Sequence, residues 1–142
     1  MANTKIPNEL LELGAKAFGT SSIMIGDTTT GTISAANYNT GVGVDVFAAL
    51  TTGDDNTAIG FASLDANTTG AGNVAIGKDA LTANTTASDN TAVGLNALLT
   101  VTTAANNTAV GTSALKLNTG IDNTAVGRGA LDSNTTASSN TA

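Results

Sequence analysis

The chain contains no cysteine, no histidine and no tryptophan among its 142 residues, and only one proline and one tyrosine. The absence of cysteine excludes disulfide bonds, and the absence of both cysteine and histidine excludes a structural zinc site of the common kind. Only carboxylates remain to serve as catalytic acid or base. We therefore expect a protein that is not an enzyme, with no catalytic, cofactor-binding or metal-binding residues.

Charged residues are also scarce, with 5 basic and 11 acidic side chains and a net charge of −6. The basic residues form no cluster, so nucleic acid is not an expected partner. No run of eighteen apolar residues occurs, and membrane insertion is not expected either. Met1 to Gly19 carries Lys5 and Lys16 without a continuous apolar stretch between them. This segment is not expected to be a secretory signal.

What the sequence does contain is a repeat of seventeen residues. Each copy opens with a motif close to Asn-Thr-Ala-Val/Ile-Gly, usually followed two residues later by Ala-Leu and then by Asn-Thr-Thr. Copies begin at Asn39, Asn56, Asn73, Asn90, Asn107 and Asn123, and a partial copy begins at Asn140. A fixed short period indicates an array of one small structural unit. Because the partial copy stops inside the motif, we expect the array to continue beyond Ala142.

Two copies depart from the pattern. The copy at Asn39 has Gly41 in place of alanine and Val46-Phe47 in place of Ala-Leu, and the copy at Asn107 lacks one residue after Thr119. A deletion in a polar turn is tolerated by a loop. Residues 22–38 form a degenerate first copy, with Ile25-Gly26 in register and residues 27–36 as a capping coil.

Seventeen residues are too few for two helices, and the composition favours strands separated by turns. Two strands of about five residues and two tight turns account for the length. The sequence therefore predicts an all-β fold, a parallel β-solenoid or β-roll over residues 22–142. Stacked coils lie ~4.8 Å apart, so the coils would form a rod of about 30 Å.

Alternation along each strand places the repeat positions in columns. We expect two apolar columns to form the core, and a third column of asparagines to hydrogen-bond from coil to coil. The Ala/Gly face would then be outside, where a second copy of the chain could approach closely. This core is thin for a lone chain, which predicts a homo-oligomer. The Ile/Val column contains Ile59, Ile76, Val93, Val110 and Val126, and the Leu column contains Leu64, Leu81, Leu98, Leu115 and Leu131.

Residues 1–21 form a separate segment for attachment or capping. Ile6 to Gly14 reads as a short helix, with Asn8 as its N-cap and Gly14 as its stop. Its leucines would either cover the first coil as a hydrophobic lid or dock the chain into a larger assembly. The two roles are compatible, because an end cap also blocks edge-to-edge aggregation.

Candidate binding chemistry is sparse. Asp54-Asp55 is the densest acidic pair and could hold calcium through its oxygens, but Asp55 occupies a turn position of the repeat, which favours a plain turn. Threonine columns, including Thr68, Thr85 and Thr135, raise the alternative of an ice-binding face. The basic residues Lys78, Lys116 and Arg128 are expected to be solvated side chains in different columns or alone.

The motifs Asn56–Gly60, Asn90–Gly94 and Gly77–Leu81 resemble the Asn-Thr-Ala-Val-Gly-x-x-Ala-Leu repeats of bacteriophage tail-fibre and appendage proteins, especially of marine and cyanobacterial phages. They are more distantly similar to head repeats of trimeric autotransporter adhesins, which are left-handed parallel β-rolls. The opening residues Met1 to Pro7 also resemble the start of phage fibre proteins, whose N-terminus joins the virion.

The resemblance implies a virion structural protein, a homotrimeric fibre rod. Its expected partners are its own copies, other tail or capsid proteins through the N-terminal segment, and a host receptor through a distal region that is not in this chain. The expected location is the virion, assembled in the host cytoplasm. The alternatives are the head region of a bacterial trimeric surface adhesin and, third, an ice-binding β-solenoid.

Overall fold

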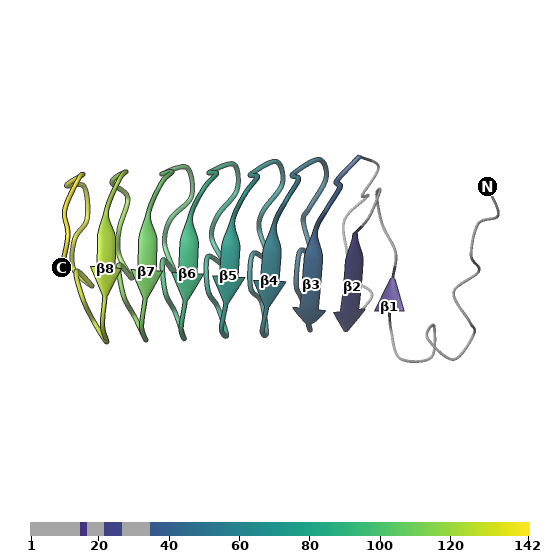
Figure 1. The fold of residues 1–142 in the computed structure, drawn as a ribbon, viewed down its shortest axis with the longest axis horizontal. Coiled ribbons are helices and arrows are strands. Elements are labelled where there is room, and N and C mark those ends of the chain that lie inside the picture. Colours follow the sequence, from purple (N-terminus) through teal and green to yellow (C-terminus); the bar gives the residue numbers. More distant parts are fainter. Residues whose placement is uncertain (1–14, 17–21, 27–34) are drawn as a thin grey trace.

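The computed structural model describes residues 15–16, 22–26 and 35–142, which form a rod of stacked coils (Figure 1). In this part of the chain eight strands form one sheet in sequence order. Strands β2 to β8 are parallel, and each pairs with the strand of the next coil. The predicted parallel β-solenoid with coils of about seventeen residues is confirmed. The strands are β1 (Ala15–Lys16), β2 (Ile23–Gly26), β3 (Thr40–Gly43), β4 (Thr57–Ile59), β5 (Val74–Ile76), β6 (Thr91–Val93), β7 (Thr108–Val110) and β8 (Thr124–Val126).

Each coil has one short strand rather than the two strands of about five residues that the sequence predicted. The remainder of the coil consists of turns and bends. Three residues in each regular coil have φ near +60°, for example Asp79 (φ 56°), Leu81 (φ 51°) and Asp89 (φ 58°). The glycine after each of the strands β4 to β8 also has a positive φ, as does Gly77 at 134°. Repeated left-handed residues turn the chain too often for a second strand to form. Hydrogen bonds still join this side from coil to coil, for example from Leu81 N to Ala97 O at 3.1 Å.

The strand register is constant along the rod. In the first copy, Ile25 lies opposite Val42, which confirms the predicted alignment. In the shortened copy, Val110 still lies opposite Val126. The missing residue is absorbed in the turn, where the amide and the hydroxyl of Thr119 both donate to the carbonyl of Thr135. The deletion therefore leaves the sheet undisturbed.

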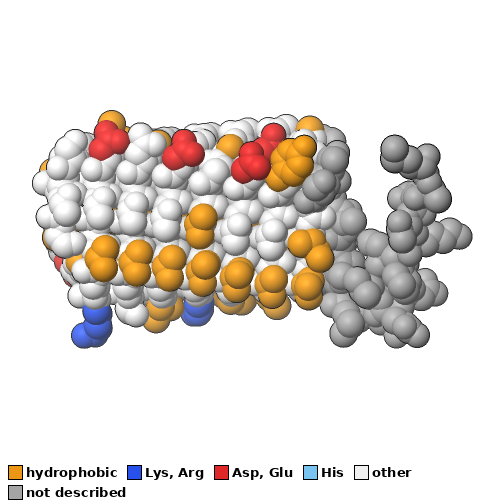
Figure 2. All heavy atoms as spheres, in the orientation of Figure 1, with side chains coloured by type: hydrophobic (Ala, Val, Ile, Leu, Met, Phe, Trp, Pro, Cys, Tyr) orange, Lys and Arg blue, Asp and Glu red, His pale blue; other side chains and the backbone are white. Residues whose placement is uncertain are grey.

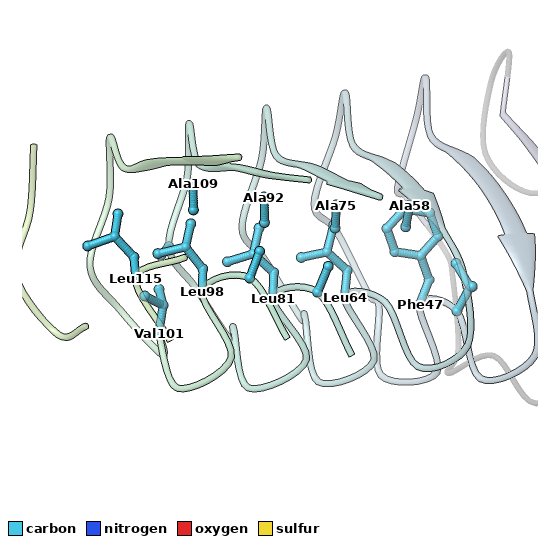
Figure 3. Packing of buried hydrophobic residues seen from close by; sticks show 14 of the residues in the cluster. Phe47, Ala58, Leu64, Ala75, Leu81, Ala92, Leu98, Val101, Ala109 and Leu115 are labelled. Carbon is cyan, nitrogen blue, oxygen red and sulfur yellow. The ribbon is translucent and has the colours of Figure 1, made fainter. Parts of the chain in front are cut away.

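The interior is filled by one row of leucines facing one row of alanines (Figure 3). The predicted Leu column is confirmed as core, since Leu64, Leu81, Leu98 and Leu115 are fully buried and Leu131 is half-buried. The alanines at the centre of the strands are also fully buried, namely Ala58, Ala75, Ala92, Ala109 and Ala125. The prediction that the alanine face is outside is therefore wrong.

The Ile/Val column was predicted to lie in the core and instead lies on the outside of the sheet. Ile59 is 39% exposed and Val110 is 37% exposed. Because neighbouring residues of a strand point to opposite faces, the buried alanine forces the next residue outward. The sequence prediction therefore exchanged the buried and the exposed faces of each strand.

The buried asparagines explain that phase. The predicted hydrogen bonding from coil to coil is confirmed in an Asn ladder comprising Asn39, Asn56, Asn73, Asn90, Asn107, Asn123 and Asn140. In a typical step, Asn90 Oδ1 accepts from the main-chain N of Asn107 at 2.9 Å and from its Nδ2 at 3.2 Å. The ladder residues from Asn56 to Asn123 each lie two positions before a strand alanine, on the same face, and Asn39 lies two positions before Gly41. A buried amide needs these partners, so the ladder fixes which face is inside.

The first regular coil has larger residues in its interior. Phe47 replaces leucine and is fully buried, and Gly41 replaces alanine on the facing strand. A Cβ at Gly41 would lie 3.0 Å from Cγ1 of Val46 and 3.1 Å from both Cγ of Met24 and Cδ2 of Phe47. The glycine thus compensates for the larger ring.

This compensation predicts non-additive mutations. Gly41→Ala alone should lower the free energy of unfolding by about 1–2 kcal/mol through overpacking. Phe47→Leu alone should lower it by about 1 kcal/mol by leaving a void. The double variant restores the alanine–leucine pair of the other coils, so its loss should be at least about 1 kcal/mol smaller than the sum. Urea denaturation of the four proteins measures this coupling, and simple additivity would contradict the compensation.

At the N-terminal end of the sheet, β1 runs antiparallel to β2 and pairs Ala15 with Ile25 and Lys16 with Met24. The predicted helix over residues 6–14 and most of the predicted capping coil over residues 27–36 lie outside the described residues. Among the residues that the structure describes, no helix is long and apolar enough to cross a membrane.

Candidate interaction surface

The outward side chains of the strands form a surface of three parallel rows, which we call the outer face. It follows from alternation, since the residues one, three and five positions after each ladder asparagine point away from the interior. The Thr row contains Thr40, Thr57, Val74, Thr91, Thr108 and Thr124. The Ile/Val row contains Ile25, Val42, Ile59, Ile76, Val93, Val110 and Val126. The flanking row contains Val44, Phe61, Lys78, Leu95, Thr112 and Arg128.

The Ile/Val row runs the length of the described rod without a charged or polar residue. Figure 2 shows it as an unbroken line of hydrophobic side chains. The exposed fractions are 42% for Ile25, 37% for Ile76 and 62% for Val126. Beside this row, the flanking row adds Phe61 at 48% and Leu95 at 43%. A contiguous exposed apolar surface of this kind typically marks an interaction site.

The two edges of the outer face carry opposite charge. Along one edge the residues directly before the ladder asparagines include Asp55, Asp89 and Asp122, all exposed. Along the other edge are Lys78 and Arg128, and Figure 2 shows acidic and basic side chains on opposite sides of the apolar row. Lys78 and Arg128 occupy the same repeat position, so the prediction that they lie in different columns is wrong.

Lys78 is held above the outer face by two contacts. Its Nζ lies 3.5 Å from Oδ2 of Asp79 and 5.8 Å from the centre of the Phe61 ring. An ammonium group at that distance from an aromatic face is attracted by the ring. The basic edge is therefore in direct contact with the apolar rows.

The acidic pair Asp54-Asp55 has a structural role. Oδ1 of Asp54 accepts a hydrogen bond from the main-chain N of Asn37 at 2.7 Å, which ties two coils together. Asp55 has a left-handed φ of 58°, as the turn interpretation requires. Within the described ranges, no three acidic, cysteine or histidine side chains gather as a metal site would need.

The threonines considered for ice binding use their hydroxyls within the protein. Thr68 Oγ1 donates to the carbonyl of Thr85 at 2.9 Å, and Thr85 Oγ1 donates to that of Thr102 at 3.1 Å. These hydroxyl protons are therefore engaged between coils. Ice binding by this column stays a prediction that these contacts disfavour.

One carboxyl on the turn side has an altered acidity. Burial, and next the nearby negative charge of Asp45, raise the pKa of Asp65 above its usual 3.8. The folded state therefore binds this proton more readily than the unfolded state does, and the contribution to stability is present below the unfolded pKa and lost as the pH rises through the folded pKa.

This shift predicts the pH dependence of one variant. Asp65→Asn removes the ionisation, so the variant should melt at a higher temperature than the parent at pH 7. The difference should shrink as the pH falls below 3.8, where the parent carboxyl is protonated in both states. Thermal melts at pH 3 and pH 7 test this. A difference in melting temperature that does not change with pH would show that Asp65→Asn does not act through the ionisation of Asp65.

A shallow hollow lies at the last coil, between Thr112, Ser113, Arg128, Gly129 and Asp132. It is open, and its ionisable residues are one cation and one carboxylate. It provides no nucleophile paired with a base. The outer face is consequently the most developed candidate site.

Comparison with protein families, with curated proteins and with solved structures finds no match for this chain. The function must therefore be argued from the rod and its surfaces. Sequence reasoning missed the outer face because it assigned the most hydrophobic residues of each strand to the core. The signal that could have found it is the Asn ladder, which has the same phase as the alanines.

Proposed function

We propose that this chain is the rod of a virion fibre or appendage, assembled as a homotrimer. In this proposal residues 1–21 attach the rod to tail or capsid proteins, and a distal region outside this chain binds the host cell. The observation that supports it best is the constant register of the parallel coils from β2 to β8. A rod of repeated coils, whose interior is packed with leucine, alanine and hydrogen-bonded asparagine, suits a spacer that holds two functional ends apart.

The chemistry of the described residues agrees with a spacer. The buried polar groups are mostly ladder and turn asparagines that bond to neighbouring coils, and the charged side chains lie on the surface. The trimer number comes from the resemblance to phage fibres and adhesin heads.

The attachment role is tested by removing Met1 to Gly19. The shortened chain should keep the circular dichroism of the full rod, while purified virions should no longer carry it in immunogold electron microscopy. The control is the full chain with the same tag. Incorporation of the shortened chain at the level of the full chain would refute attachment through this segment.

The same solenoid also suits the head of a bacterial surface adhesin, which is the second candidate. The two differ in where the native protein is found. Antibodies against the rod should label phage particles in the first case and the bacterial envelope in the second. Labelling of the envelope in uninfected cells would replace the virion proposal.

A further inference from the structure

The outer face is large enough to hold a second copy of the chain. Coils spaced ~4.8 Å apart and rows ~7 Å apart give a surface of roughly 30 by 20 Å, or about 600 Å² on each copy. In a face-to-face pair, two such faces would bury about 1,200 Å² in total, which exceeds the ~1,000 Å² expected of a specific interface. Its centre is the Ile/Val row, and no charged residue lies in the Ile/Val row or the Thr row.

The charged edges indicate how two copies are oriented. When parallel copies are related by rotation about an axis along the rod, the acidic edge of one lies beside the basic edge of the next. An antiparallel pair packed face to face would instead bring the two acidic edges together. Opposite charges favour the first arrangement and like charges disfavour the second.

The repeat register sets the positions of the charged residues along the rod axis. Asp122 and Arg128 belong to the same turn-and-strand segment, so copies in register place Arg128 of one beside Asp122 of the other. Along the rod axis, Lys78 is offset by one coil, about 4.8 Å, from the positions of both Asp55 and Asp89. The apolar rows then align along their whole length, because every copy has the same coil spacing.

We propose that the outer face is a self-association surface, on which copies of this chain pack parallel and in register with the acidic edge of each against the basic edge of its neighbour. The proposal rests on the proposed function only for the number of copies. It replaces the small-residue face that the sequence suggested for this role, since those alanines are buried.

The apolar part is tested with the full chain by sedimentation equilibrium. The parent should have a mass that is a multiple of 13.8 kDa. Ile76→Lys places an unpaired charge at the centre of the Ile/Val row and should weaken association about 100-fold. Leu117→Lys is the matched control, because Leu117 is 43% exposed and lies outside the outer face. It should associate like the parent, and circular dichroism should show both variants folded.

The orientation is tested by exchanging charges. Arg128→Glu and Asp122→Lys should each weaken association, and the double variant should recover most of it. Failure of the double variant to recover would overturn the parallel arrangement.

A monomeric parent at about 100 μM would overturn self-association altogether. Equal weakening by Leu117→Lys and Ile76→Lys would also overturn the assignment to the outer face. Thermal hysteresis by a monomeric parent would indicate that the outer face binds ice instead of a second copy of the chain. Loss of virion attachment leaves the mass in solution unchanged, so the attachment role and self-association through the outer face fail separately.

Discussion

Asn90→Ala is expected to lower the free energy of unfolding by about 4 kcal/mol, because it leaves the buried main-chain N of Asn107 without an acceptor and removes one acceptor of its side-chain Nδ2. These two atoms now lie 2.9 and 3.2 Å from Asn90 Oδ1, and Nδ2 keeps its bond to the carbonyl of Ala105 at 3.1 Å. The variant also loses the bond from its own Nδ2 to the carbonyl of Ala104, at 3.0 Å. The melting temperature should fall by roughly 10–15 °C, measured by circular dichroism.

The same substitution at Asn140 is the matched control. Asn140 donates to Asn123 Oδ1 through its main-chain N at 3.0 Å and through its Nδ2 at 2.9 Å, and no described residue follows it in the ladder. Its loss leaves no ladder donor orphaned, so the change should be below about 1 kcal/mol. Equal effects at the two positions would show that the ladder does not stabilise the fold through its acceptors.

The native chain itself shows which kind of orphan is tolerated. Oδ1 of Asn84 is buried without a hydrogen-bond partner. In the preceding coil, Asn67 Oδ1 accepts from Asn84 Nδ2 at 3.1 Å, but the next coil has Val101 at this position. A single unpaired acceptor is thus accommodated, whereas Asn90→Ala would leave the main-chain N of Asn107 as an unpaired donor. Orphaned donors are the rarer of the two in folded proteins.

Gly94→Ala is expected to lower the free energy of unfolding by about 5 kcal/mol. Gly94 has a φ of 135°, which residues with a side chain rarely adopt. Its Cβ would also lie 2.6 Å from both the carbonyl carbon and oxygen of Gly111 in the next coil. Backbone cannot move aside there without breaking the stack, so urea denaturation should show a large loss.

Gly127→Ala separates the two contributions. Gly127 has nearly the same φ of 136°, but a Cβ there meets only the Cβ of Ala130, at 4.0 Å. This variant should lose about 2 kcal/mol from backbone strain alone. A loss at Gly127 as large as that at Gly94 would mean that collision between coils contributes nothing.

The period of the sequence predicted most of the fold. The nearly constant spacing of the asparagines implied stacked coils, and the pairing of Thr57 with Val74 and of Thr91 with Thr108 confirms that spacing. The Leu row was predicted correctly because leucine recurs at one repeat position and no other large apolar residue recurs beside it. What could not be derived was the number of strands, since residues such as Leu81 bend left-handed against the ordinary preference of leucine.

Hydrophobicity alone could not predict which face of each strand is buried. A strand offers two faces that differ by one residue, and the more apolar face is ordinarily the buried one. Here the buried face belongs to Asn90 and Ala92, because the asparagine amides find partners only inside the coil. The outward position of Val93, which is half-buried, follows from that choice, and the candidate interaction surface follows from Val93 and its equivalents.

The hydrogen bonds between coils have a mechanical consequence. They run along the rod, so a force applied to its two ends would break the hydrogen bonds of one coil after another. Each coil that opens would release seventeen residues, which span ~55 Å when extended in place of ~4.8 Å when stacked. Under tension such a rod would lengthen stepwise and dissipate energy at each step. A tether of this construction would yield gradually under load instead of breaking at one point.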